Sequence, residues 1–95
     1  MEHEIVFLLG AEIDFLEFYR DHGDRFYDDV QEILSLLARN PWFGPKRFQQ
    51  QRRLLIAGGP FALFYGIQGR RILITAIIDL RRDPQWIREK LHDRS

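Results

Sequence analysis

The side chains with the most scope for chemistry in this 95-residue sequence are arginines in its C-terminal half. Six of them form the adjacent pairs Arg52-Arg53, Arg70-Arg71 and Arg81-Arg82. The other basic residues nearby are Lys46, Arg47 and Arg88, and the aromatic residues among them are Phe48, Tyr65 and Trp86. Basic residues with aromatic neighbours bind nucleic acid, and guanidinium groups also form paired hydrogen bonds with the carboxylates of an acidic protein segment. The alternative interpretation is that these arginines only solvate strand ends, and a hairpin tip alone explains Arg70 and Arg71.

Nucleophiles, bases and metal ligands are scarce. Apart from tyrosines, the hydroxyl and imidazole side chains are Ser35, Thr75, Ser95, His3, His22 and His92. None of the hydroxyls falls on a turn that would present a nucleophile, and no histidine has partners at metal-ligand spacing. The run Gly58-Gly59-Pro60 lacks the context of a phosphate-binding loop. We therefore expect neither a metal nor a cofactor.

Composition limits the molecule to one small domain, residues 1–95, with no cysteine and therefore no disulfide. The N-terminal residues are acidic where a signal peptide would be basic. The longest later apolar run, Ile72 to Ile78, is far shorter than the roughly 20 residues that cross a bilayer. We expect a cytoplasmic protein with no membrane partner.

Charge is divided between the two parts of the chain although the formal net charge is zero. Residues 1–40 hold ten acidic and three basic side chains, a balance of −7, and residues 41–95 hold four and eleven, a balance of +7. This asymmetry indicates either a functional basic face or helices that carry acids and strands that carry arginines.

The elements that must position these residues can be read from apolar periodicity. Residues 4–8 predict a strand, and 11–22 a helix that is apolar on two sides, beginning after an N-cap at Gly10 and ending at Gly23. Asp24 is the expected N-cap of a second helix, which Asn40-Pro41 ends. One continuous stripe of this helix should be buried: Phe26, Val30, Ile33, Leu34 and Leu37.

The rest of the chain predicts mainly strands. Residues 41–50 contain two prolines and a glycine and are typical of a loop. Strands are expected near 52–57, 61–67 and 71–80, before a C-terminal helix opened by Pro84. The fold class is therefore α+β, a two-helix hairpin packed on a small antiparallel sheet, in the order β-α-α-β-β-β-α.

Strand 71–80 is apolar on both of its expected faces. Alternation places Ile72, Ile74, Ala76 and Ile78 on one face and Leu73, Thr75 and Ile77 on the other. The helix hairpin can cover only one of these faces. The terminal helix and a partner protein are the candidates to cover the other.

The order and spacing of several motifs resemble the RelE/ParE superfamily of toxins, the plasmid-stabilisation protein family. "EILSLLARNPWFGP" is similar to the family's second helix and its Asn-Pro-x-x-Gly exit, and "RRLLIAGGPFALFYGIQGRRILITAIIDLRRDP" to its strand meander. The pair Phe64-Tyr65 and the closing run from Arg81 to Pro84 match best. The resemblance covers residues 4–88 and implies the poison half of a type II toxin–antitoxin pair.

Two departures bear on which branch of the family the chain resembles. Gly66 stands where the family often has a basic residue, and Asp79-Leu80 where it usually has His-Gly. The loss of this histidine disfavours the ribosome-dependent messenger RNA endoribonucleases and favours the ParE-like branch, whose members resemble binding inhibitors of DNA gyrase. A degenerate member that only binds its antitoxin is the third alternative.

The resemblance implies partners and site residues. The partners are a cognate antitoxin and either DNA gyrase or the ribosome with messenger RNA, in a homodimer or a toxin–antitoxin heterotetramer. The residues expected to bind antitoxin or target are Arg52, Arg53, Leu73, Ile77, Arg81, Arg82 and Trp86. If the chain is instead a ribonuclease, the candidate catalytic residues are Arg52, Arg53, Tyr65, Asp79, Arg81 and Arg82, with Asp79 as the base.

Overall fold

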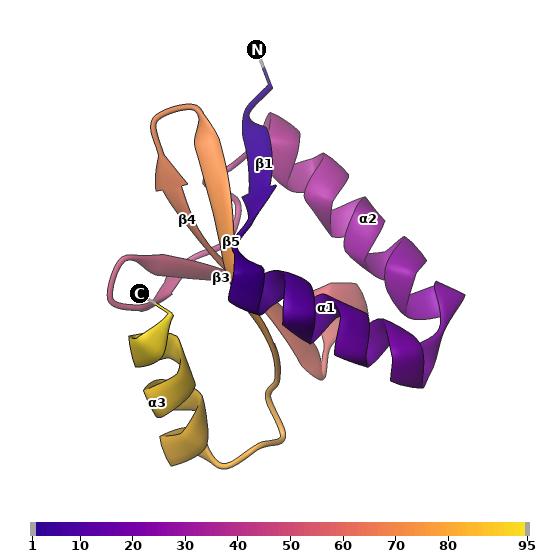
Figure 1. Ribbon diagram of the computed structural model, residues 1–95. Coiled ribbons are helices and arrows are strands. Elements are labelled where there is room, and N and C mark those ends of the chain that lie inside the picture. Colours follow the sequence, from indigo (N-terminus) through magenta and orange to yellow (C-terminus); the bar gives the residue numbers. More distant parts are fainter. Residues whose placement is uncertain (1, 95) are drawn as a thin grey trace.

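A computed structural model describes residues 2–94, and one mixed sheet lies between a helix hairpin and a single C-terminal helix (Figure 1). The elements are β1 (Glu4–Phe7), α1 (Leu9–His22), α2 (Asp24–Arg39), β2 (Lys46–Phe48), β3 (Gln51–Leu55), β4 (Phe61–Gln68), β5 (Arg71–Asp79) and α3 (Pro84–Asp93), with a 3-10 turn at Ile56–Gly58. The predicted α+β class and the helix hairpin are confirmed.

The sheet has the strand order β1-β5-β4-β3-β2 and is not wholly antiparallel. β1 runs parallel to β5, with Glu4 opposite Arg71, whereas β2, β3, β4 and β5 form an antiparallel meander. The expectation of a purely antiparallel sheet is therefore wrong at one edge. Parallel neighbours require a long connection, and here the two-helix hairpin and most of the meander separate β1 from β5.

The segment expected to be a loop, residues 41–50, contains the short strand β2, which pairs with β3 across a turn at Gln49 and Gln50. β3 ends at Leu55, two residues earlier than the predicted strand 52–57, because Ala57 takes a left-handed conformation with φ 51°. Short apolar runs predict that a strand is present more reliably than they predict where it begins and ends.

The helix ends also differ in detail from the prediction. α1 starts at Leu9, so Gly10 lies inside the helix and is not its N-cap. Gly23 ends α1 with φ 75°, as expected, and is also the residue that precedes α2. Asp24 is then the first residue of α2 and accepts a 2.8 Å hydrogen bond from the Tyr19 hydroxyl.

The predicted apolar stripe of α2 faces the sheet. Phe26, Val30 and Leu37 are buried, and Ile33 and Leu34 are half-buried against the same core. The helical period therefore predicted the correct face. The expectation that all five side chains would be buried is confirmed for three of them.

A bulge at Thr75 changes which residues of β5 share a face. Phe64 pairs with Ala76 but the next residue, Tyr65, pairs with Ile74, so Thr75 is the additional residue. Ile72, Ile74 and Ile77 consequently lie in the core beneath the helix hairpin. Ala76 and Ile78 belong to a second, smaller cluster on the opposite face, which α3 covers. The strict alternation expected for 71–80 is therefore wrong beyond Thr75.

Candidate interaction surface

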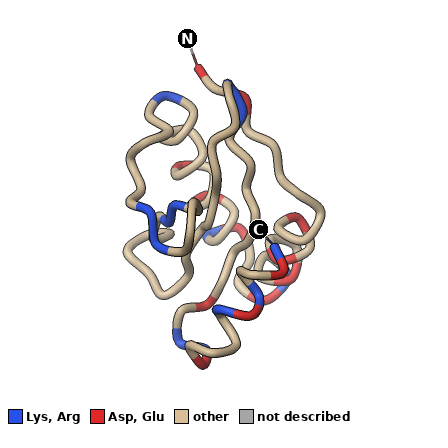
Figure 2. The backbone as a smooth tube through the Cα atoms, turned by 90° about the vertical axis from the view of Figure 1, so that its left-hand side faces the viewer, with Lys and Arg blue, Asp and Glu red and all other residues tan. Residues whose placement is uncertain are grey.

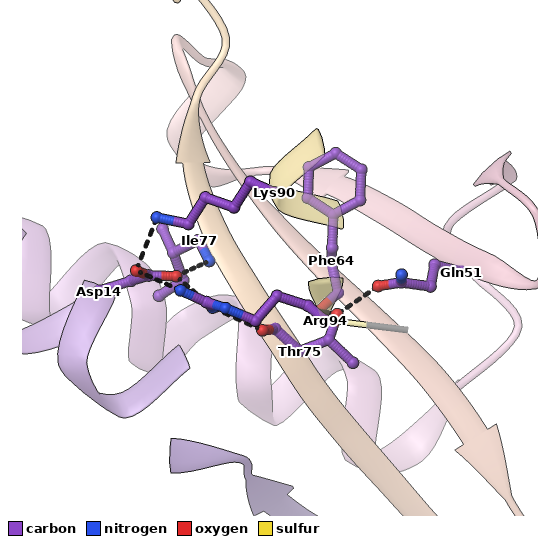
Figure 3. A network of polar contacts seen from close by, with 7 residues as sticks. All are labelled: Asp14, Gln51, Phe64, Thr75, Ile77, Lys90 and Arg94. Carbon is purple, nitrogen blue, oxygen red and sulfur yellow. Dashed lines mark hydrogen bonds and ion pairs between the residues drawn. The ribbon is translucent and has the colours of Figure 1, made fainter. Parts of the chain in front are cut away.

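A buried carboxylate joins α1, β5 and α3 (Figure 3). The side chain of Asp14 is 4% exposed and forms ion pairs with Lys90 at 3.1 Å and Arg94 at 3.0 Å. It also accepts a 3.1 Å hydrogen bond from the backbone N–H of Ile77. Gly10 leaves room for the Arg94 guanidinium group, because a Cβ at that position would lie 2.5 Å from Cζ of Arg94. The cluster anchors α3 to the sheet.

This cluster could not be predicted from the sequence. With a helix beginning near residue 11, Asp14 would lie in the first turn, where the helix dipole ordinarily explains an acidic residue, but α1 begins at Leu9 and Asp14 lies beyond that turn. Its partners come from the other end of the chain, 76 and 80 residues away. The only available signal was an acidic residue between the two apolar stripes of one helix, and that signal does not identify a partner.

A second polar link runs across the face covered by α3, and Figure 3 shows its two central side chains. The Thr75 hydroxyl donates to the side-chain carbonyl of Gln51, and Nε2 of Gln51 donates to the backbone carbonyl of Leu91 at 3.4 Å. Both Gln51 and Thr75 are buried. Thr75 is thus a structural residue at the bulge and not a nucleophile.

Asp79 and Arg81, two of the predicted site residues, are paired with each other. Nε and an amino nitrogen of Arg81 donate to the two carboxylate oxygens of Asp79 at 2.9 and 2.7 Å, and the Arg81 backbone N–H adds a third bond. The hydrogen bond from the Arg81 side chain is the main reason that the pKa of Asp79 falls to about 2. A carboxylate with so low a pKa is a poor general base near neutral pH.

Arg82 is exposed and Trp86 is half-buried at the start of α3. The Arg82 guanidinium carbon lies 3.8 Å from the centre of the Trp86 ring, and Nζ of Lys90 lies 4.9 Å from it. The ring therefore carries cations on its surface, and its apolar part packs against the second core cluster. This site offers to a partner the positive charge that the Trp86 ring holds in place.

Tyr65 is fully buried, and its hydroxyl is committed to the loop that follows α2. It accepts a hydrogen bond from Gly44 N–H at 2.9 Å and donates to the Pro41 carbonyl at 2.8 Å. Burial raises the pKa of Tyr65. Arg52 supports the same loop by donating to the Gly44 carbonyl at 2.8 Å. Gly44 has no room for a Cβ, which would lie 2.6 Å from the Arg53 carbonyl oxygen.

The structure does not bring the predicted basic residues into one site. Arg52 and Arg53 are adjacent on β3 and lie opposite Tyr65 and Phe64, so they face opposite sides of the sheet. Arg81 comes two residues after Asp79, and Asp79 pairs with Phe61 of β4. Arg53 pairs with Phe64, which lies three residues, or roughly 10 Å, further along β4 than Phe61. Figure 2 shows the Lys and Arg positions in several separate stretches of the backbone.

The two aliphatic residues predicted to contact a partner have different surroundings. Ile77 is 1% exposed within the core beneath the helices, so the expectation that it faces a partner is wrong. Leu73 is half-buried, belongs to neither core cluster, and lies opposite Val6 and Gly66 on the neighbouring strands. Leu73 therefore remains available on the face that α3 covers only in part.

Two negative observations apply to residues 2–94. No group of three or more His, Asp and Glu side chains is placed to hold a metal ion. None of the helices combines the length and apolar character needed to cross a membrane. Ser95, one of the hydroxyls considered above, lies outside the described residues.

Replacing Tyr65 by phenylalanine should lower the free energy of unfolding by about 1–3 kcal/mol, because it leaves two buried backbone groups of the loop without a partner. Urea denaturation of the two proteins measures this difference. Tyr27→Phe is the matched control, since Tyr27 is exposed, and it should change stability by less than about 0.5 kcal/mol. Equal stabilities of the Tyr65→Phe variant and the parent would contradict a structural role.

The Asp79 carboxyl should titrate near pH 2, below its ordinary pKa of 3.8. Because the folded pKa is lowered, the stabilising pair with Arg81 is fully present above about pH 4 and is lost as the pH falls through 2. NMR titration of the carboxyl carbon measures the midpoint. Arg81→Gln should raise it towards 4, whereas Arg88→Gln should not; a midpoint near 4 in the parent would refute the pairing.

Comparisons with known proteins give similarity to solved structures. No family model matches the sequence, and no curated protein matches it. Among solved structures, the fold is similar to that of a YoeB/ParE toxin from Agrobacterium tumefaciens, with a TM-score of 0.48 and 14% sequence identity. That similarity covers 78% of this chain and 94% of the other.

Proposed function

We propose that this chain is the toxin of a type II toxin–antitoxin pair and that it inhibits DNA gyrase by binding, without catalysing a reaction. The proposal starts from the motifs that run from the second helix to Pro84 and from the fold, which places a helix hairpin and a strand meander in the expected order. Because one fold supports different activities, the choice of mechanism depends on the site residues.

A binding mechanism is favoured because both candidate acid–base residues, Tyr65 and Asp79, are already held by hydrogen bonds within the protein. Tyr65 is buried and bonded to Gly44 and Pro41, so it cannot reach a phosphate. Asp79 is held by Arg81 and has a pKa of about 2. Arg52 and Arg53 face opposite sides of the sheet, and the strand positions next to Arg53 and Asp79 lie roughly 10 Å apart, so the backbone does not gather the arginines around one point. A ribonuclease needs such groups together.

The surface proposed for antitoxin or target lies around the start of α3 and the uncovered part of the same sheet face. Its residues are Arg53, Leu73, Arg81, Arg82 and Trp86. Cations over an aromatic ring next to apolar surface suit an acidic segment with apolar anchors. The endoribonuclease and the member that only binds antitoxin remain the competing functions.

Expression of the chain without a partner should stop growth and induce a DNA-damage response. In purified assays, we expect inhibition of gyrase supercoiling and no cleavage of messenger RNA on ribosomes. Arg82→Glu should weaken the gyrase effect at least about tenfold if roughly 1.4 kcal/mol of binding is lost. Arg25→Glu, on the acidic helix hairpin, should not weaken it.

These assays distinguish the proposed function from each of the two competing functions. Codon-dependent cleavage of ribosome-bound messenger RNA would replace the gyrase proposal with the enzyme. Normal growth, unchanged supercoiling and intact messenger RNA would leave a protein that poisons neither target.

A further inference from the structure

The outer face of α1 carries an apolar stripe that the fold leaves open. Leu9, Ile13 and Leu16 are 73%, 47% and 54% exposed. Their spacing of four and three residues places them on one side of the helix. Isolated exposed aliphatic residues are ordinary, but three on one continuous stripe of a 14-residue helix form a surface that another helix can contact.

This stripe has no part in holding α1 on the sheet. The helix contacts the core through Ala11, Phe15 and Phe18, which lie on its opposite side. Asp14, on a third side, makes the ion pairs with α3. The exposed ring of Tyr27 on the neighbouring helix α2 packs at 6.0 Å from Phe15, on the side of α1 that faces away from the stripe.

The charges around the stripe select the kind of partner. Glu12 and Glu17 lie on its two sides and are exposed, and Asp21 lies one turn beyond Glu17. Arg20 is the nearest base on α1, and it already pairs with Asp21 at 3.3 Å. An apolar stripe between acidic residues is complementary to apolar side chains flanked by lysines or arginines.

We infer that α1 docks an amphipathic helix of another protein, with apolar residues at three- and four-residue spacing and Lys or Arg on both sides of them. This surface is separate from the arginine-bearing one around α3, and the inference does not depend on the proposed function. A second copy of the chain would oppose Glu12 and Glu17 with the same acidic face. Anionic lipid is disfavoured by the same acids.

The test is an NMR titration of the full-length, isotope-labelled chain with two synthetic helical peptides of about 18 residues. Both carry leucines at the required spacing, flanked by lysines in one and by glutamates in the other. The lysine peptide should shift the amide signals of residues 9–20 and bind at least about tenfold more tightly than the glutamate peptide. Equal binding of both peptides, or shifts confined to other elements, would overturn the inference.

Variants separate the apolar and the charged contributions. Leu16→Asp should abolish binding, whereas Leu55→Asp, at a 39% exposed leucine of β3, should leave it unchanged. The double variant Glu12→Lys with Glu17→Lys should reverse the preference between the two peptides. Melting curves verify that all variants fold. Sedimentation of the chain alone shows whether it forms a dimer. A dimer that dissociates when Leu16 is replaced by aspartate would assign the stripe to a second copy of the chain and overturn the inference.

Discussion

Replacing Asp14 by alanine should destabilise this protein by about 3–5 kcal/mol, the range observed when one member of a buried ion pair is removed. The substitution leaves Lys90 and Arg94 without their counter-charge and the Ile77 N–H without its acceptor. Both cations are 23% exposed, so water relieves part of the cost and the lower end of the range is expected. Urea denaturation measures the effect.

Two further variants distinguish the buried cluster from an ordinary surface pair. Asp21→Ala removes an exposed pair with Arg20 and should cost less than about 1 kcal/mol. Arg94→Ala should cost much less in the Asp14→Ala background than in the parent, because the two side chains act through each other. Hydrogen exchange of α3 should accelerate in Asp14→Ala. If Asp14→Ala and Asp21→Ala are equally stable, the cluster does not anchor α3.

Ile77→Asp should unfold the protein, whereas Leu73→Asp should lower the free energy of unfolding by only about 1 kcal/mol. Ile77 lies in the core beneath α1 and α2, where an unpaired carboxylate loses its hydration. Leu73 lies outside both core clusters and retains contact with water. Loss of cooperative thermal unfolding in Ile77→Asp and its retention in Leu73→Asp are the expected results.

The same pair of variants tests the bulge at Thr75. With strict alternation, residues 73 and 77 would share a face and the two substitutions would have similar effects. Similar melting temperatures for the two variants would therefore refute the bulge. Only Leu73→Asp is suitable for testing antitoxin binding, since loss of binding by an unfolded Ile77→Asp chain carries no information about the surface.

Local patterns in the sequence were sufficient for the helix hairpin and for the existence of most strands. The stripe from Phe26 to Leu37 identified the buried face of α2, because a helix presents every third or fourth residue to the same side. Gly23 and Asn40-Pro41 located the helix ends to within a residue, since their backbone preferences interrupt a helix regardless of what surrounds it.

The candidate site was harder to predict because it depends on pairing between distant segments. Tyr65 carries no local sign that its hydroxyl bonds Gly44 and Pro41. The arginine pairs suggested a common basic site, but β3 turns Arg52 and Arg53 to opposite faces. Asp79 and Arg81 are only two residues apart, but this spacing alone does not predict their ion pair. Whether the two side chains meet depends on the backbone conformation at the end of β5.

By itself the sequence determined most local elements: which segments are helical or extended, except for the short strand β2, and which side of α2 is apolar. Only the tertiary structure decided the roles of particular side chains. It made Asp14 a buried anchor through partners at the far end of the chain, and one additional residue at Thr75 moved Ile77 into the core. It also left Leu9, Ile13 and Leu16 of the doubly apolar helix α1 uncovered. The physical reason is that periodicity and backbone preference act over a few residues, whereas burial depends on which distant segments pack together.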